Sequence, residues 1–256
     1  MSQSEPVILK SLYRYPVKGL TAQPMQDALL EPGQTLPLDR AYAIENGTRL
    51  FDQANPVHMP KTKFLMLMRH ERLAQLETTF EDEGHTLAIF RNQRQVARGR
   101  LIEPVGRNII EQFFAAFMPD ALLGPPVIVH APGHSISDVK DKCLSIINLA
   151  SLGELARITG REIHPLRFRA NIYLEGLAPF AEFDWLDREI KIGGARLQVF
   201  KRTQRCAAVN VDPETGARDL ALPQALLGAY GHSDMGVYAR VIEAGPISRG
   251  DPVSEA

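Results

Sequence analysis

Short runs of β-forming residues, separated by polar turns, are the feature that most constrains the fold of this chain. Three such runs, residues 75–80, 86–91 and 95–101, follow one another closely in the first half. A further pair of runs lies within residues 189–200 and flanks Gly193-Gly194, and a Gly-Gly pair supplies the positive φ angles that a tight hairpin turn needs. Strands of this length and spacing predict an antiparallel sheet or a barrel.

Helical periodicity interrupts the β pattern at three places. Residues 105–117 carry Ile and Phe at helical spacing, residues 150–160 place Leu and Ile on one face and end at a glycine, and residues 220–230 have Pro223 near their start. The remaining β-type runs are residues 7–15, 28–33, 38–45, 64–68, 127–130, 144–148, 166–174 and 237–243. The sequence therefore predicts an α+β fold that is rich in β structure.

A change of pattern near Pro119 indicates a domain boundary. Residues 1–118 hold the predicted β-meander, and residues 119–256 hold the hairpin and two of the predicted helices. A chain of 256 residues is long enough for two modest domains. Because the composition hardly changes at this point, it stays open whether strands of one part complete the barrel of the other.

Charge and cysteine content exclude several classes of protein. The formal net charge of −1 does not favour nucleic acid as a partner. Cys143 and Cys206 are the only cysteines, so we expect no disulfide framework, zinc ribbon or cysteine-bound iron–sulfur cluster. Residues 1–6 lack the basic-then-apolar order of a secretory leader, and no apolar run approaches the roughly eighteen residues of a membrane span. These features predict a cytoplasmic protein.

Cys206 follows a cationic stretch that contains Lys201, Arg202 and Arg205. Nearby positive charge favours the thiolate, which is the form that attacks electrophiles and binds soft metals. The turn signature Asp212-Pro-Glu-Thr-Gly216 comes shortly afterwards. The segment alone leaves a second reading open, in which Cys206 is a small buried hydrophobic residue.

Residues 166–174 form the second informative stretch. On a strand, alternate residues share a face, so Arg167, Arg169 and Asn171 are expected to point the same way. Two guanidinium groups and an amide on one face suit a phosphate or a carboxylate. No acidic residue lies between Glu162 and Glu175 to pair with these arginines. The alternative is a charged strand face in contact with solvent.

Five segments, taken together and in order, resemble the MOSC family with its N-terminal β-barrel partner domain. The resemblance extends over residues 7–253 and is closest to the amidoxime-reducing branch of the family. The segments are residues 12–19 (LYRYPVKG), residues 38–40 (LDR), residues 167–171 (RFRAN), Arg205-Cys206 with residues 212–216 (DPETG), and residues 250–253 (GDPV). The resemblance implies a MOSC-type β-barrel with peripheral helices and an N-terminal β-barrel-like domain.

The resemblance also implies a molybdenum cofactor, in which a pyranopterin dithiolene with a phosphate group holds the metal. A cysteine thiolate completes the metal sphere in such relatives, and its match here is Cys206, which would be both the metal ligand and the catalytic residue. The implied cofactor-binding positions are Lys18, Gly19, Arg40, Asn148, Ala150, Ser151, Arg167, Arg169, Asn171, Gln204 and Arg205. Cys143 lies outside the matched segments and is expected to be structural. The family also carries a pyridoxal phosphate association, to which no residue of this chain is assigned.

Three departures from the family pattern affect these expectations. Gly19 stands where animal relatives have a hydroxyl residue, so one cofactor contact is in doubt. Residues 207–210 replace hydroxyl residues with small apolar ones, which leaves the substrate open. The cysteine-rich extension of one bacterial relative is not found before Ala256, so the electrons are expected to come from a separate ferredoxin-, flavodoxin- or cytochrome-type protein.

The resemblance therefore implies an oxidoreductase that reduces small N-hydroxylated compounds. The alternative is a carrier or transferase of the molybdenum cofactor or of sulfur, with Cys206 as the transfer residue. A non-catalytic anion-binding module is the third hypothesis.

Overall fold

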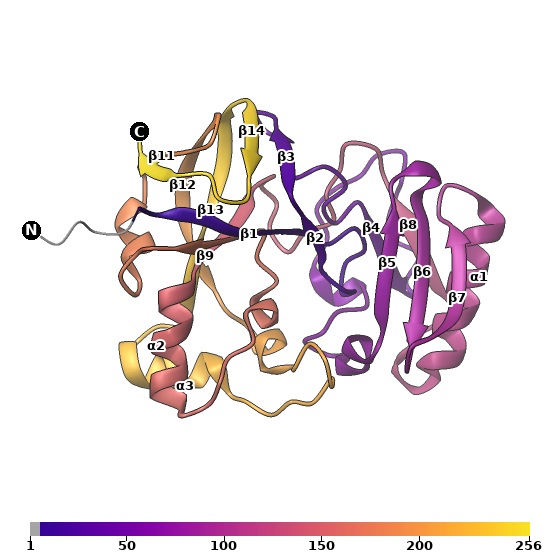
Figure 1. Cartoon of the computed structure of the whole chain (residues 1–256). Helices are drawn as coiled ribbons and strands as arrows, with labels where there is room; N and C mark the ends of the chain where they lie inside the picture. The colour runs from indigo at the N-terminus through magenta and orange to yellow at the C-terminus, as the bar shows by residue number, and fades with distance from the viewer. Residues whose placement is uncertain (1–5) are drawn as a thin grey trace, which may run out of the picture.

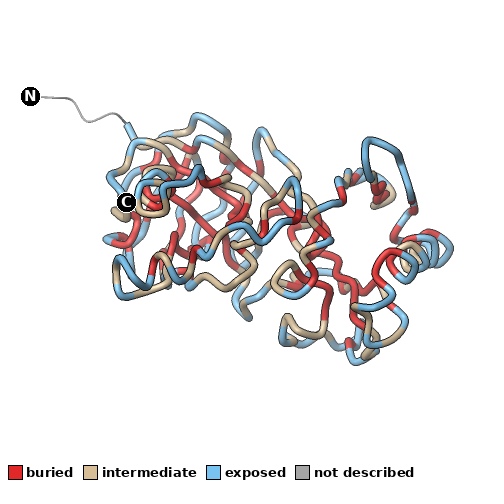
Figure 2. The backbone as a smooth tube through the Cα atoms, turned by 90° about the horizontal axis from the view of Figure 1, so that it is seen from below, coloured by how far each residue is buried: buried red, intermediate tan, exposed pale blue. Residues whose placement is uncertain are grey.

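The computed structural model describes residues 6–256. The chain forms two β-rich parts that lie side by side (Figure 1). Buried backbone runs through the centre of each part, and exposed loops surround it (Figure 2). The expectation about a missing secretory leader concerns mainly residues 1–5, which lie outside the described residues.

A curled eight-stranded sheet dominates the larger part. Its strands are β1 (Ile8–Arg14), β2 (Gln23–Met25), β9 (Leu144–Asn148), β10 (Ile172–Glu175), β11 (Glu189–Ile192), β12 (Ala195–Gln204), β13 (Asp234–Glu243) and β15 (Val253–Glu255). They are arranged in the order β15-β11-β12-β13-β9-β10-β1-β2. Neighbours are antiparallel except β9 and β10. The predicted β-rich α+β class and the hairpin at Gly193-Gly194 are confirmed.

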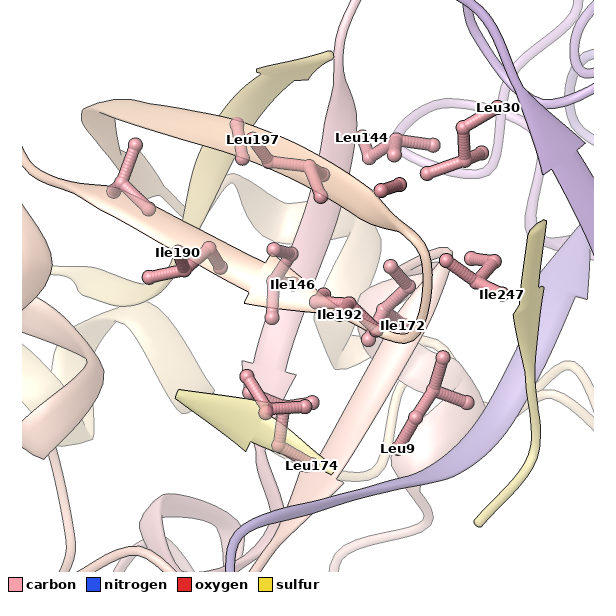
Figure 3. Close-up of a cluster of buried hydrophobic side chains, with 14 of the residues drawn as sticks. Leu9, Leu30, Leu144, Ile146, Ile172, Leu174, Ile190, Ile192, Leu197 and Ile247 are labelled. Carbon is pink, nitrogen blue, oxygen red and sulfur yellow. The ribbon is translucent and has the colours of Figure 1, made fainter. Parts of the chain in front are cut away.

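The inner face of this sheet encloses an aliphatic core (Figure 3). Since alternate strand residues point to opposite faces, Ile146 and Ala239 enter the core while Ser145 and Tyr238, their chain neighbours, point outward. Ser145 is the register partner of Tyr238, and Tyr238 is the register partner of Lys201. These three side chains form a polar row on the outer face of the sheet.

The smaller part contains the predicted β-meander. Its strands are β4 (Tyr42–Asn46), β5 (Glu77–Glu81), β6 (Thr86–Arg91), β7 (Arg94–Arg100) and β8 (Pro126–His130). Strands β5, β6 and β7 pair in sequence, and β4 pairs with β8. Helix α1 (Pro104–Phe117) covers the meander and buries Ile110 and Phe114 in the second core, as its periodicity predicted.

Two further helices pack on the outer side of the large sheet. Helix α2 (Leu149–Thr159) and helix α3 (Leu222–Tyr230) enclose a third apolar cluster with Ile147 and Tyr173. Helix α2 ends at Gly160, which adopts a φ of 62° as a left-handed cap. No helix among residues 6–256 is long and apolar enough to cross a membrane.

Short 3-10 helices connect several of these elements. They are η1 (Lys61–Lys63), η2 (Glu71–Gln75), η3 (Glu83–His85), η4 (Pro119–Ala121), η5 (Pro165–Phe168), η6 (Ala181–Trp185) and η7 (Ala207–Asn210). The first and last of them, η1 and η7, border the cavity described below.

Strand pairing crosses the expected boundary at residues 118 and 119. Strand β1 pairs with β10, and β3 (Asp27–Leu30) pairs with β14 (Gly245–Ser248). The beginning of the chain therefore lies with the large sheet, while β8 lies with the smaller part. The division into residues 1–118 and 119–256 stays a proposal about domains.

Three strand predictions were wrong in part. Residues 166–174 begin with η5, and only Ile172–Glu175 form a strand, because Arg169 adopts a left-handed φ of 52°. Residues 38–45 begin with a turn in which Arg40 has a φ of 50°. Residues 64–68 form turns after a single bridge between Glu45 and Phe64.

Candidate functional site

A cavity of about 330 Å³ is lined by both parts of the molecule. It collects most of the residues that the sequence suggested, from segments far apart in the chain. These residues are Lys18, Gly19, Arg40, Arg167, Arg169, Asn171, Gln204, Arg205 and Cys206. A second cavity of about 410 Å³, lined by residues of the 29–41 and 130–142 segments, contains none of the candidates.

Cys206 is half-buried at the start of η7, where the extended strand β12 has ended. Its Sγ lies 3.2 Å from the Nζ of Lys61. Lys61 is 145 residues away in the sequence and comes from η1 of the smaller part. Sequence reasoning missed this lysine, because the only signal would have been the Pro60-Lys-Thr-Lys63 stretch, which resembles any solvated turn.

The basic residues just before Cys206 do not contact its sulfur, although the sequence suggested that they would favour the thiolate. Arg202 packs over the ring of Phe183, at 4.3 Å from its centroid. Arg205 donates to the backbone oxygens of Met235 and Phe168. Lys201 lines the cavity as an exposed side chain. The positive group in contact with the Cys206 sulfur is therefore Lys61.

Arg169 and Arg205 lie in the cavity wall without a carboxylate in ion-pair contact. Neither forms an ion pair with a carboxylate among residues 6–256. Arg169 donates to the backbone oxygen of Leu20 at 2.6 Å and lies over the Tyr15 ring. Burial lowers the pKa of Arg169 to about 10. A partly desolvated cation is costly, so this arrangement favours an anion in the cavity.

Arg40 lies against the same aromatic ring as Arg169. Its guanidinium is 4.3 Å from the centroid of Tyr15, and it donates to the backbone oxygen of Arg169 at 2.8 Å. Its charge is shared with Asp39 through an ion pair. Burial raises the pKa of Tyr15 to about 12, so this phenol stays neutral between the two guanidiniums.

Lys18 is buried at the cavity, next to Gly19. Its Nζ donates to the backbone oxygen of Ile136 at 3.1 Å and forms an ion pair with Asp138. Burial lowers the pKa of Lys18 and outweighs the opposing effect of Asp138. Gly19 has a φ of 84°, and an added Cβ would lie 3.0 Å from the backbone oxygen of Leu65. The positive φ and this close approach favour glycine at position 19.

Arg167 is paired internally, which corrects the shared arginine face expected from the sequence. It forms ion pairs with Asp212 at 2.8 Å and with Asp219 at 2.9 Å. Both acids lie about fifty residues later in the chain. The absence of acidic residues near Arg167 in the sequence therefore did not mean that Arg167 lacks an ion-pair partner. Arg167 therefore holds the loop of the Asp-Pro-Glu-Thr-Gly motif.

That loop in turn contacts the smaller part of the molecule. Arg218 donates to the backbone oxygens of Leu67 and Met68 and forms an ion pair with Glu71. Gly216 lies where an added Cβ would approach the Glu71 oxygen to 3.1 Å. The loop of residues 212–218 therefore links the larger part to the smaller part through contacts with residues 67–71.

Asn171 uses its amide to connect three strands. Its Oδ1 accepts from the backbone nitrogen of Ser145 at 3.1 Å, and its Nδ2 donates to the backbone oxygen of Tyr13 at 3.1 Å. It lines the cavity, but these contacts occupy its side chain. The Asn171 side chain therefore holds neighbouring segments of the cavity wall together.

Asn148, Ala150 and Ser151 are not brought to the cavity. Asn148 caps helix α2 by accepting from the Ala150 nitrogen, and its Nδ2 donates to Glu182 at 3.2 Å. Ser151 donates to both carboxylate oxygens of Glu182 at 3.0 Å. Glu182 is fully buried, and its need for donors accounts for these side chains.

The cavity wall also contains two hydroxyl groups without partners. Ser145 and Thr203 line the cavity, and their side-chain oxygens are buried with no hydrogen-bond partner among the described residues. Buried polar groups are normally satisfied. Together with the unmatched guanidiniums and a free thiol, these atoms fit a polar, anionic group with a thiophilic metal.

Comparison with known proteins identifies the C-terminal part. Residues 132–254 match the family model of the MOSC domain. The chain is 31% identical over 120 residues to mitochondrial amidoxime-reducing component 1 of Mus musculus, a match that covers 42% of this chain and 35% of that protein. It is 36% identical over 106 residues to the molybdenum cofactor sulfurase of Caenorhabditis elegans, covering 40% and 15%. The matches thus span about a third or less of these relatives.

Among solved structures, similar chains include YiiM of Geobacillus stearothermophilus and the YUAD protein of Bacillus subtilis. YiiM is 24% identical with a TM-score of 0.36, over 44% of this chain and 53% of that one. The YUAD protein is 13% identical with a TM-score of 0.45, over 99% and 97%. The family match and the curated relatives agree that the C-terminal part of the chain, residues 132–254, is similar to MOSC domains.

Proposed function

We propose that the cavity binds a molybdenum cofactor and that the protein is an oxidoreductase that reduces small N-hydroxylated compounds. The observation that carries this proposal is the combination, in one cavity, of the free thiol Cys206 with two guanidinium groups that have no carboxylate in ion-pair contact, Arg169 and Arg205. A thiolate suits a metal that already has sulfur ligands, and the guanidiniums suit the phosphate of the pterin.

Different residues of the cavity would bind the phosphate and the metal of the cofactor. Lys18, Arg40 and Arg169, gathered around Tyr15 and the turn after β1, would hold the phosphate. Cys206 would bind the metal, with Lys61 beside its sulfur. When bound, such a cofactor supplies two-electron removal of oxygen from nitrogen, and the protein fixes, orients and shields it.

The smaller part would contribute to substrate access. Lys61 and residues 66–68 of the smaller part line the cavity, and so does Ala208 of η7. These residues would exclude bulk water and shape the space for a small substrate. Electrons would come from a separate donor protein of the ferredoxin, flavodoxin or cytochrome type. The cytoplasm is the proposed location, because both cysteines are free thiols. The names of the relatives reported above do not support an association with pyridoxal phosphate.

A matched pair of cysteine variants tests the proposal. In protein from a host that makes the cofactor, Cys206→Ala should lose or alter its molybdenum and lose hydroxylamine reduction with supplied electrons. Cys143 also lines the cavity, but its sulfur has no contact with Lys61 and burial raises its pKa to about 12, so Cys143→Ala should keep both. Full activity and bound molybdenum in Cys206→Ala would refute the ligand assignment.

The second candidate is a carrier or transferase of the cofactor or of sulfur. It is favoured by the similarity to a protein named molybdenum cofactor sulfurase. In this case Cys206 would carry a persulfide, which Lys61 would stabilise as an anion. Mass spectrometry of the intact protein separates the two candidates, because a persulfide on Cys206 in a protein inactive on hydroxylamines would favour transfer.

A further inference from the structure

Asp138 places a negative charge in the middle of the cationic cavity. Its Oδ1 forms an ion pair with Lys18, and its Oδ2 lies 3.3 Å from the Nζ of Lys61. Lys61 in turn contacts the sulfur of Cys206. A chain of alternating groups, Lys18–Asp138–Lys61–Cys206, therefore runs across the cavity. Neither Asp138 nor Lys61 was suggested by the sequence.

This carboxylate is ionised at any physiological pH. Burial acts to raise its pKa, but Lys18 and Lys61 outweigh burial and hold the pKa well below its ordinary value. Its field also reaches Arg40 and Arg169, where it favours the charged forms. Asp138 thus supplies to the cavity the kind of charge that a bound phosphate would bring.

The two anions would need the same lysine. Lys18 is buried, and its ammonium group is already used by Asp138 and by the backbone oxygen of Ile136. A phosphate held by Lys18, Arg40 and Arg169 would stand close to the carboxylate, and like charges at a few ångströms repel by several kcal/mol at an effective dielectric constant of about 20. Binding therefore requires Asp138 to move away from Lys18.

We propose that Asp138 is an internal counter-anion that pairs with Lys18 and competes with an incoming phosphate group for it. This inference rests on the proposed anion site in the cavity, and it adds the residue that sets the affinity of that site. The competition lowers the affinity for every anion by the same factor. A ligand with strong contacts to the guanidiniums, such as a phosphate monoester, still binds. Small monoanions make weaker contacts and do not bind.

The loop that carries Asp138 is suited to such a displacement. Residues 131–143 connect β8 to β9 without regular secondary structure, and the Asp138 side chain is 46% exposed. Turning its side chain toward solvent breaks its two ion pairs, with Lys18 and with Lys61. Lys61 would then keep Cys206 as its remaining partner.

Phosphate titration of the full chain tests the proposal. The protein is produced in a host without the cofactor, and inorganic phosphate is titrated by calorimetry at about pH 8. Asp138→Asn keeps the shape and removes the charge, so it should bind phosphate about tenfold more tightly. The control is Asp141→Asn in the same loop, because Asp141 is 49% exposed, pairs with Arg240 and lies outside the cavity lining; its affinity should stay within about twofold of wild type.

A second variant guards against an indirect effect. In a Lys18→Met background, Asp138→Asn should no longer strengthen binding, because the lysine for which the anions compete is gone. An unchanged or weaker affinity of Asp138→Asn would overturn the proposal and make Asp138 a group that orders the lysines for the ligand. Equal gains with and without Lys18 would also overturn it, since they would indicate a general charge effect.

The result also separates this inference from the proposed function. If phosphate binds and responds to Asp138→Asn, but protein from a competent host contains no molybdenum, only the proposed function fails. If neither wild type nor Asp138→Asn binds phosphate, the anion site itself is refuted and this inference fails with it.

Discussion

The cavity around Cys206 and the cluster around Glu182 are both polar regions next to the large sheet, yet they differ in how their charges are matched. The carboxylate of Glu182 is fully buried and receives hydrogen bonds from Asn148 and Ser151. In the cavity, Arg169 and Arg205 have no carboxylate partner, and two hydroxyl groups have no partner among the described residues. A satisfied cluster serves the fold, whereas unmatched charge around a cavity indicates a ligand.

The same contrast separates two arginines that are two residues apart. The charge of the buried Arg167 is neutralised by Asp212 and Asp219, while its Nε has no hydrogen-bond partner among the described residues. Arg169 bonds only to backbone and lies over Tyr15. The first should contribute mainly to stability, and the second mainly to binding.

Arg169→Met should produce the largest effect, on phosphate affinity. Removing a guanidinium from a partly desolvated anion site typically costs about 2–5 kcal/mol of binding energy, so affinity should fall by about thirtyfold or more. The free energy of unfolding should change by less than about 1 kcal/mol, because an uncompensated charge is removed. Calorimetric titration and urea unfolding of the same sample measure the two quantities.

Arg167→Met should show the opposite pattern. It leaves Asp212 and Asp219 without their common partner, and the free energy of unfolding should fall by about 2 kcal/mol once the partial exposure of both acids is taken into account. Phosphate affinity should stay within about twofold. A large loss of phosphate binding at unchanged stability would break the distinction between the two arginines.

Glu182→Gln should produce the smallest effect, visible as a change in pH dependence. Burial raises the pKa of Glu182 above its ordinary 4.5, although its hydrogen-bond donors act in the other direction. The folded state therefore holds the proton more tightly than the unfolded state, so the contribution of Glu182 to stability is full below pH 4.5 and is lost as pH rises through the folded pKa.

Urea unfolding of wild type and Glu182→Gln between about pH 4 and pH 8 checks this direction. The stability of wild type relative to the variant should decrease as the pH rises. Parallel curves would mean that the Glu182 pKa does not differ between the folded and unfolded states. A relative gain for wild type with rising pH would mean that the ionised carboxylate is the form that the cluster stabilises.

Local features of the fold were predictable from the sequence, and long-range ones were not. The β-meander, the hairpin at Gly193-Gly194 and helix α1 depend on periodicity and turn residues within a short window. The pairing of β1 with β10 joins residues about 160 apart, which no local pattern encodes. The prediction of a strand over residues 166–174 fails at Arg169, because the left-handed backbone there ends the extended conformation and places the guanidinium over Tyr15.

The candidate site follows the same rule. Cys206 and Arg169 stand out in the sequence through residue type and local charge, and both line the cavity. Lys61 and Asp138 were missed, because their importance depends on contacts with residues more than a hundred positions away. Asn148 and Ser151 were placed in the site by resemblance alone, and the buried Glu182 that engages them lies about thirty residues further on.

The content of molybdenum and pterin per chain, measured in wild-type protein from a host that makes the cofactor, tests the central claim most directly. The account predicts close to one molybdenum and one pterin per chain, both retained through purification. Protein that comes from the same host without metal and without pterin would contradict it, and would leave the unmatched charges of the cavity to a different anion.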